Sequence, residues 1–318
     1  MDILITGSVA YDYLMTFPGL FKEQILPERL EKISLSFLVD SMSRQRGGIA
    51  PNIAYTMALL GERPRVMATV GEDFEEFRQW LESKGVDTSL MKVVPGLYTA
   101  SFFATTDQSN AQIASFYPGA MDVAADQSLH DVPNRPDLVV VSPNSPQAMT
   151  KFAAECRALK LPYLYDPSQQ ILRLEGRELA RDMEGAHFLF VNDYEFELIS
   201  KKTGLDLPNM LKHVDVIVVT RGKDGSTVYA AGEEYNIPVV PEVSIVDPTG
   251  VGDAFRGGFL SGYARGWNWK LCGQIGSLAA TYCLEQKGTQ NHSFTRFEFV
   301  KRFRQHFDDN GILDAMIQ

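Results

Sequence analysis

Short apolar runs alternate with longer segments of helical spacing along most of this chain, and that pattern predicts an α/β protein. The alternation is most regular in the second half. A strand–helix–strand series of this kind predicts a three-layer, doubly wound and mainly parallel sheet with helices on both faces. The predicted strands of this series are Leu138–Val141, Tyr163–Tyr165, Phe188–Val191 and Val216–Thr220, and the helices between them include Gln147–Leu159 and Tyr194–Thr203.

The two ends of the chain extend the same series. At the N-terminal end we expect strands at Ile3–Thr6 and Val66–Val70, a glycine turn at Arg46–Ala54 opening a helix through Leu60, and a helix at Asp73–Lys84. At the C-terminal end we expect strands at Ser226–Ala230 and Glu234–Ile237, a β-rich run at Val239–Val246, and helices at Gly250–Arg265 and Trp269–Glu285.

Two segments deviate from this series and predict a second, smaller sheet. Residues 30–46 alternate weakly between apolar and polar positions, as expected of a half-exposed strand. Tyr98–Thr105 and Gln112–Tyr117 flank a polar turn and predict a β-hairpin. We therefore expect one domain, 1–318, with lid segments at about 9–46 and 96–120 inserted in the α/β body. A lid of this kind would exclude water from the site beneath it.

Composition indicates which classes of partner and which cellular compartment to expect. The 30 basic and 40 acidic residues give a net charge of −10, which does not favour a nucleic-acid-binding surface. No run of 18 apolar residues occurs, so we expect no membrane span. The start, M-D-I-L-I-T-G, lacks the basic region of a signal peptide. The 3 cysteines, Cys156, Cys272 and Cys283, have no metal-binding spacing and read as reduced core residues of a cytoplasmic protein.

The stretch Asp247–Phe259, D-P-T-G-V-G-D-A-F-R-G-G-F, carries the clearest chemistry. Glycines at a helix N-terminus offer unpaired N–H groups to phosphate oxygens. A carboxylate in the first turn is suited to taking a proton from an attacking hydroxyl. We therefore expect phosphoryl transfer, with Gly250–Gly252 (including Val251) as an amide anion hole and Asp253 as base. The alternative is a glycine turn whose Asp253 only complements the helix dipole.

Two widespread nucleotide-binding motifs are absent. No G-x-x-x-x-G-K-[ST] occurs in the chain, and Phe255 stands where the third glycine of a dinucleotide fingerprint would be. A nucleotide site in this chain is therefore neither of the P-loop nor of the Rossmann type.

Polar residues at predicted strand ends mark the edge where ligands bind in open α/β sheets. Ser8 and Asp12 follow the first strand and could hold a polar ligand. The alternative is that Ser8 only stabilises a turn and Asp12 is only solvated. Asn192 ends a strand and Glu195 follows at a helix start. These two residues are suited to Mg²⁺, directly or through water, and equally to capping the helix.

With these motifs in hand, the chain resembles the ribokinase-like (PfkB) family of carbohydrate and nucleoside kinases over nearly its whole length. Gly47–Asn52, with Gly61 and Gly71, is similar to the N-terminal signature, and Asp247–Asp253 to the C-terminal one. Asn192–Glu195 is similar to the N-x-x-E magnesium motif. Val251 departs from the small residue usual at its position, which matters little if only its N–H is used.

Within the family, the runs S-L-S-F-L-V-D, A-Q-I-A-S-F-Y-P-G-A-M and D-P-S-Q-Q most resemble bacterial adenosine kinases. The resemblance implies ATP and Mg²⁺ as cofactors, a K⁺ or Na⁺ ion near Asp247, and Asp253 as base. It implies ribose contacts from Ser8, Asp12, Gly48 and Asn52; purine contacts from Ser36, Phe102, Phe116, Met121 and Gln170; phosphate contact from Arg173; ATP contacts from Asn192, Thr220 and Gly222; and water-mediated Mg²⁺ contact from Glu195.

The implied reaction is adenosine plus ATP giving AMP and ADP, as in purine salvage. The alternatives are a ribokinase-like kinase for a sugar or for inosine and guanosine, and a catalytically silent nucleotide-binding regulator. Core packing is the ordinary role of aromatic residues such as Phe102 and Phe116, but on a lid they favour a base-bearing substrate over a bare sugar. A small sheet also has edges that need cover, so a homodimer formed through the lid is a further expectation.

Overall fold

The computed structural model describes residues 1–318 apart from 26–30, 32–33 and 318. Within the described residues, a 9-stranded sheet has the order β13-β12-β11-β10-β9-β8-β1-β4-β5. The strands from β11 to β5 pair in parallel, and β12 and β13 close one side as an antiparallel pair. The strands are β1 Ile3–Thr6, β4 Arg65–Val70, β5 Asp87–Val93, β8 Leu138–Val141, β9 Tyr163–Tyr165, β10 Ala186–Asn192, β11 Val214–Thr220, β12 Ser226–Ala230 and β13 Glu233–Ile237.

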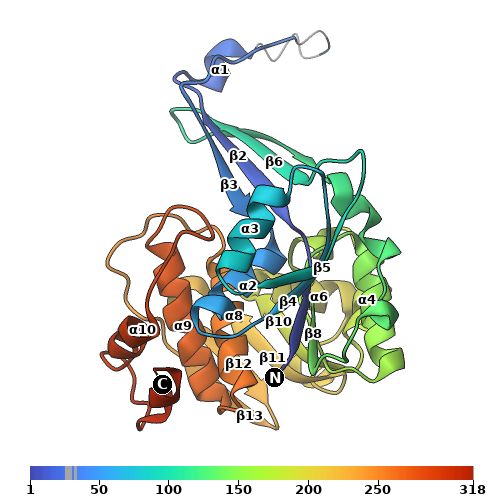
Figure 1. Cartoon of the computed structure of the whole chain (residues 1–318), viewed down its shortest axis with the longest axis vertical. Helices are drawn as coiled ribbons and strands as arrows, with labels where there is room; N and C mark the ends of the chain where they lie inside the picture. The colour runs from blue at the N-terminus through green and yellow to red at the C-terminus, as the bar shows by residue number, and fades with distance from the viewer. Residues whose placement is uncertain (26–30, 32–33, 318) are drawn as a thin grey trace.

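Helices cover both faces of this sheet because its buried strands are apolar on both sides. Within β1, Ile3 and Ile5 belong to one apolar core and Leu4 to the other. One core contains α2 Ile49–Leu59, α3 Glu75–Ser83, α8 Val251–Ala264 and part of α9 Trp269–Leu284. The other contains α4 Pro146–Leu159, α5 Gly176–Met183, α6 Asp193–Thr203 and α7 Leu207–Met210. Figure 1 shows α8 and α9 on one side of the sheet and α4 on the other.

The smaller sheet is the lid, which has the strand order β3-β2-β6-β7. In Figure 1, β2, β3 and β6 project from the body, with α1 Phe21–Gln24 at their far end. The hairpin of β6 and β7 is antiparallel, and β2 joins β6 in parallel. The lid strands are β2 Ala10–Thr16, β3 Ser41–Gly47, β6 Ala100–Thr106 and β7 Gln112–Tyr117.

The remaining elements fill the connections and the C-terminal end. Helix α10 Arg296–Phe303 packs on α9 through a third apolar core that includes Phe299 and Phe303. The short 3₁₀ helices are η2 Gly119–Asp126, η3 Leu129–Asp131, η4 Ser168–Leu172, η5 Gly222–Asp224 and η6 Ile312–Met316.

The predicted architecture is confirmed, and two local predictions are wrong. Val239–Val246 forms no strand, because Pro238 and Pro241 interrupt the ladder and the backbone of Val240 hydrogen-bonds instead to the Ser277 and Thr281 side chains of α9. The strand predicted within 30–46 is confined to Ser41–Gly47, while 34–40 lies outside regular structure. Position 33 of that predicted alternation lies outside the described residues.

The structure bears on two predictions made from composition, one on the cysteines and one on membrane spans. Cys156, Cys272 and Cys283 are all buried and unbonded to one another, as expected of core thiols. Among the described residues, no helix has both the length and the apolar character needed to cross a membrane.

Candidate active site

Polar side chains gather along one edge of the body sheet. Because β1, β9, β10 and β11 are parallel, their carboxyl ends share that edge. Asn192 and Thr220 end β10 and β11 as direct partners in the ladder. Asp166 follows β9, and Ser8 follows β1, where its Oγ accepts a hydrogen bond from Ile49 N at 3.3 Å. The strand topology therefore brings together residues that lie far apart in the sequence.

Helix α8 begins at this edge with the glycine turn of the Asp247 stretch. Gly250 is the N-cap, with the left-handed φ of 76° that favours glycine, and the helix starts at Val251. In the first turn, the Gly252 N–H has no hydrogen-bond acceptor among the described residues, and the Val251 N–H makes only a long hydrogen bond of 3.5 Å to the Pro248 carbonyl. Asp253 stands in the same turn, and its side chain is 13% exposed.

Asp253 is held from two sides. Asn52 Nδ2 donates to Asp253 Oδ2 at 2.9 Å, and the Arg256 guanidinium lies 4.0 Å from Oδ1. Asn52 is itself fixed by Gln290, whose Nε2 donates to Asn52 Oδ1 at 2.9 Å. The side chain of Asn52 therefore orients the carboxylate, and its predicted contact with ribose stays a prediction.

The electrostatics of Asp253 suit a proton acceptor. Burial raises the pKa of this carboxyl to about 6, while Arg256 and the Asn52 hydrogen bond oppose the rise and Glu195 adds to it. A group with a pKa near 6 is mostly ionised at neutral pH and accepts a proton more readily than an ordinary exposed aspartate. The carboxylate is thus available as a base.

Asp12 projects from β2 of the lid toward the same region. Its carboxylate lies so close to Gly47 that a Cβ on residue 47 would stand 2.6 Å from Oδ2. Burial raises the pKa of Asp12 to about 6, and the neighbouring charge of Asp247 adds to the rise. Gly48, next in the chain, is the N-cap of α2 with a φ of 92°. Gly47 thus leaves room for the Asp12 carboxylate, and Gly48 lets the start of α2 pack against the backbone of Ser8–Ala10.

One face of the lid presents aromatic side chains beside Asp12. Asp12 is directly opposite Phe102 in the β2–β6 pair, and Phe102 is opposite Phe116 in the β6–β7 pair. Directly paired residues point to the same face of a sheet, so these three side chains lie in a row. Met121 is 6% exposed and packs under this row against Ala10.

The Asn192–Glu195 pair caps its helix. Asn192 Oδ1 accepts from Glu195 N at 2.7 Å, and Glu195 Oε2 accepts from Asn192 N at 2.8 Å. The capping alternative is therefore present in the structure, and it leaves the second Glu195 oxygen for other contacts. Gly222, with a φ of 53°, starts η5 just beyond Thr220.

Asp247 anchors the start of the glycine turn. Partial burial alone would raise its pKa, but the N–H groups of Thr249 and Gly288, each 2.9 Å from a carboxylate oxygen, lower it overall. The described residues contain no group of three or more His, Cys, Asp or Glu side chains that could hold a metal ion. A single carboxylate such as Glu195 fits Mg²⁺ that keeps most of its waters and binds phosphate, as Mg²⁺ does in kinase sites.

The side chains of three predicted site residues make no hydrogen bond or ion pair with the other site residues in the described part of the chain. Gln170 lies in η4 with its Oε1 buried and without a hydrogen-bond partner among the described residues. Ser36 and Arg173 are exposed, and in the described part of the chain no hydrogen bond or ion pair connects their side chains to the other site residues. Their predicted contacts with purine and phosphate stay predictions.

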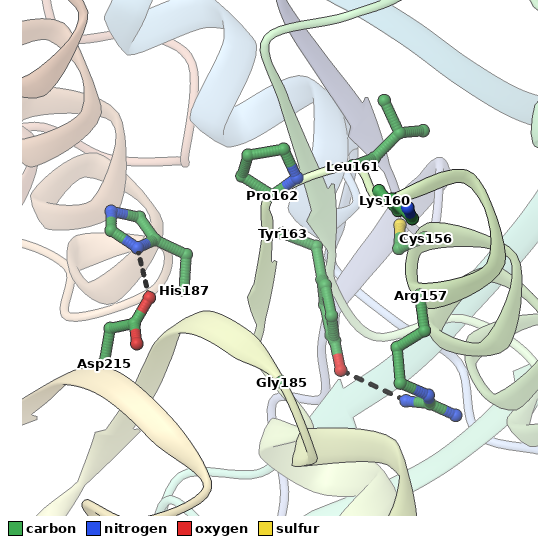
Figure 2. A pocket seen from close by; sticks show the side chains of 9 residues that line it. All are labelled: Cys156, Arg157, Lys160, Leu161, Pro162, Tyr163, Gly185, His187 and Asp215. Atoms are coloured by element: carbon green, nitrogen blue, oxygen red, sulfur yellow. Dashed lines mark hydrogen bonds and ion pairs between the residues drawn. The ribbon is translucent and has the colours of Figure 1, made fainter.

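Two cavities lie away from this edge. A cavity of about 600 Å³ lies on the opposite face of the lid, beside Tyr13 and Phe103, which alternate with Asp12 and Phe102. Another of about 360 Å³ lies near the amino ends of β9, β10 and β11 (Figure 2). There His187 Nδ1 lies 2.9 Å from Asp215 Oδ2, and no predicted site residue contributes to the lining. The lining residues are Cys156, Arg157, Lys160, Leu161, Pro162, Tyr163, Gly185, His187 and Asp215.

The sequence similarity to a known family covers the whole of this site. Residues 6–296 match the family described as pfkB family carbohydrate kinase. The chain belongs to this family. The match includes both glycine motifs, the lid strands and the Asn192–Glu195 pair, so the family prediction is confirmed.

The pfkB-family relatives include several named as nucleoside kinases. A nucleoside kinase of Methanothermobacter thermautotrophicus is 31% identical over 95% of this chain and 95% of its own length. A Burkholderia thailandensis nucleoside kinase, solved in complex with inosine, is 36% identical with a TM-score of 0.85, covering 96% of this chain and 98% of that one. The structure of a Methanocaldococcus jannaschii nucleoside kinase, 28% identical, matches with a TM-score of 0.86 over 96% and 99% of the two chains.

Within this pfkB-family site, sequence reasoning missed Arg256 and the loop containing Gly288, Thr289 and Gln290. A buried arginine inside the small, apolar run of α8 is itself a signal, because such a charge needs a partner. The glycine and polar residues just after α9 were a weaker signal for a loop that returns to the site.

Proposed function

We propose that this protein is an ATP-dependent nucleoside kinase that transfers the γ-phosphoryl group of ATP to the 5′-hydroxyl of adenosine, giving AMP and ADP. The observation that carries the proposal is the ionisable carboxylate of Asp253, fixed by Asn52 at the amide-rich start of α8. Several relatives named as nucleoside kinases, which are similar over nearly the full chain, support the substrate class.

In this proposal the nucleoside lies between the body and the lid. The carboxylate of Asp12, which lies beside Gly47, accepts from the ribose hydroxyls. The base rests against the aromatic row that includes Phe102 and Phe116. Asn52 and Gly48 complete the ribose contacts. With the ribose fixed at both ends, the 5′-hydroxyl is directed toward Asp253.

Asp253 takes the proton of the 5′-hydroxyl as its oxygen bonds to the γ-phosphorus. The bond between that phosphorus and the oxygen bridging to the β-phosphate breaks, and ADP leaves with the electron pair. The N–H groups of Val251 and Gly252 stabilise the charge on the transferred group. Little covalent work falls to the protein, so positioning and charge carry most of the rate.

ATP and its metal ion belong at the carboxyl ends of β10 and β11. Asn192, Thr220 and Gly222 would line the nucleotide, and Glu195 would hold Mg²⁺ through water. Bound Mg²⁺ would neutralise phosphate charge. Asp247, whose pKa is lowered, is ionised and suited to a K⁺ or Na⁺ ion near the glycine turn.

The deciding experiment is a panel of nucleosides and sugars incubated with Mg·ATP, with products identified by mass. We expect AMP from adenosine and no product from ribose or fructose 6-phosphate. A panel in which a sugar is phosphorylated and no nucleoside is would replace the proposal with the sugar-kinase alternative. ATP binding without any phosphorylated acceptor would favour a silent regulator.

Inosine or guanosine is the second candidate substrate, because the Burkholderia thailandensis relative was solved with inosine. Gln170 offers a discriminating feature. Its buried, unpartnered Oε1 is an acceptor suited to the 6-amino group of adenine, whereas a 6-oxo purine would require the amide to rotate. The ratio of kcat/KM for adenosine and inosine, measured side by side, separates the two.

The lid also supports the expected homodimer. All six residues of β7 are exposed, and this strand forms one edge of the lid sheet. A second copy pairing at this edge would cover its free backbone groups. Light scattering of the native protein and of an Ile113→Lys variant tests this, since a monomeric native protein would refute it.

A further inference from the structure

Arg256 stands one helical turn after Asp253 and lies between two carboxylates. The arginine is only 9% exposed. Its Nη2 donates to Asp166 Oδ1 at 2.9 Å, and its Nε lies 2.7 Å from Asp166 Oδ2. On the other side its Nη1 lies 4.0 Å from Asp253 Oδ1. The guanidinium thus forms a two-point ion pair with one aspartate while it faces the other.

The glycine turn is shaped to admit this guanidinium. A Cβ on Gly252 would stand 2.9 Å from Arg256 Nη1, so the arginine lies directly against the backbone of the predicted anion hole. Asp166 is fully buried at the end of β9, which fixes the far side of the pair to the sheet rather than to a loop. The arginine is therefore held in place independently of any ligand.

The titratable groups around Asp253 come from several elements. Arg256 lies on its own helix, Asp166 at the end of β9 and Glu195 on α6; the Cys283 thiol on α9, whose pKa is raised by burial, and Asn52 on α2 are neutral. Arg256 is thus the single cation acting on Asp253 within this described group, against two neighbouring carboxylates. Its loss would leave the ionised form of Asp253 without a compensating charge.

We propose that Arg256 is a positioning residue for the transfer: it fixes the Asp253 carboxylate and keeps it ionised, and Asp166 sets how much of the arginine's charge acts on Asp253. The proposal rests on the proposed kinase function for its consequence in catalysis. Its physical content, the influence of Arg256 and Asp166 on Asp253, holds independently of the substrate.

The test compares the midpoint of the acidic limb of kcat against pH, at saturating Mg·ATP and nucleoside, in matched variants. Arg256→Met removes the cation, so the midpoint should rise by about 1–3 pH units. Asp166→Asn removes the competing carboxylate, so the midpoint should fall. Arg256→Lys keeps the charge and should stay nearer the native midpoint than Arg256→Met.

Arg256→Met leaves Asp166 buried without its partner and is at risk of misfolding. The double variant Arg256→Met/Asp166→Asn restores neutrality, and its midpoint should lie between those of Arg256→Met and the native protein. Shifts of opposite sign for the two single sites are not expected from mere structural damage. Reduced activity with an unmoved midpoint in every folded variant would overturn the proposal.

The same midpoints can be read without turnover from the side-chain ¹³C signal of Asp253, identified by its absence in an Asp253→Asn sample. If the native protein phosphorylates no nucleoside, the proposed function fails. The order of the NMR midpoints still decides whether Arg256 and Asp166 control Asp253. The two proposals therefore fail on different observations.

Discussion

Replacing Asp253 by asparagine is the most direct test of the proposed chemistry. The change removes the base but keeps the size of the side chain, and its amide oxygen can still accept from Asn52. Arg256 stays paired with Asp166, so no buried charge is left alone. The variant should therefore fold, bind adenosine and lose only the proton transfer.

The expected loss follows from the role of the group. With a pKa of about 6, Asp253 is mostly ionised at pH 7.5, so most native molecules carry the carboxylate that the proposal uses as the base. Removing a general base typically slows turnover by about 10²–10⁴-fold, or roughly 3–5 kcal/mol in the activation free energy. We expect kcat to fall in that range or further.

The assay follows ADP release at saturating Mg·ATP and adenosine, with calorimetric binding of adenosine measured in parallel. Asp215→Asn is a matched control, because its 75% exposed side chain lies at the amino end of β11, away from the site. That variant should turn over like the native protein. If Asp253→Asn kept turnover within about fivefold of native, the base assignment would be refuted.

The same substitution has a predicted effect on stability. Because the pKa of Asp253 is raised from 3.8 to about 6 in the folded protein, its contribution to stability is full below pH 4 and is lost as the pH rises through 6. A neutral asparagine avoids that loss, which is on the order of 3 kcal/mol at most. We expect Asp253→Asn to melt at a higher temperature than the native protein at pH 8, with the difference vanishing near pH 4.

Three further outcomes follow from the geometry. Because the pKa values of Asp12 and Asp253 are both raised to about 6, kcat/KM for the nucleoside should fall as the pH drops through 6, and a flat profile down to pH 5 would contradict this. Gly47→Ala should raise the nucleoside KM roughly tenfold or more, since its Cβ would displace the Asp12 carboxylate, with KM for ATP as the internal control. Phe116→Ala should raise the nucleoside KM by about 5–100-fold through lost stacking, whereas Tyr117→Ala, on the opposite lid face, should not; equal effects would argue against the aromatic row.

The parallel body was predictable because buried strands are apolar runs with few alternatives. Leu138–Val141 and Tyr163–Tyr165 were predicted with the bounds that the structure has. The lid strand β2, Ala10–Thr16, was not predicted, because Leu14 and Met15 break the alternation of apolar and polar residues and its pairing depends on partners distant in the sequence. The β-rich prediction for Val239–Val246 was wrong because β-branched residues form a strand only where a neighbouring strand can pair with them.

The local structure around the candidate site was predictable where one residue type implies one backbone conformation. Glycines before Asp253 indicated an anion hole, and the helix indeed begins at Val251. The hydrogen bonds from Gln290 to Asn52 and from Asn52 to Asp253 could not be read from the sequence, since 238 and 201 positions separate the partners. Long-range side-chain contacts of this kind carry no local pattern.

The loop Gly288–Gln290 has a mechanical consequence. Its three residues bind, in turn, Asp247 at the glycine turn, the Arg46 carbonyl at the root of a lid strand, and Asn52 on α2. The base of the lid is thereby hydrogen-bonded to the same loop that contacts the glycine turn and α2. Substitutions in the outer part of the lid would therefore leave the hydrogen bonds from this loop to Asp247, Arg46 and Asn52 intact, so in the proposed kinase the base contacts could change without moving Asp253.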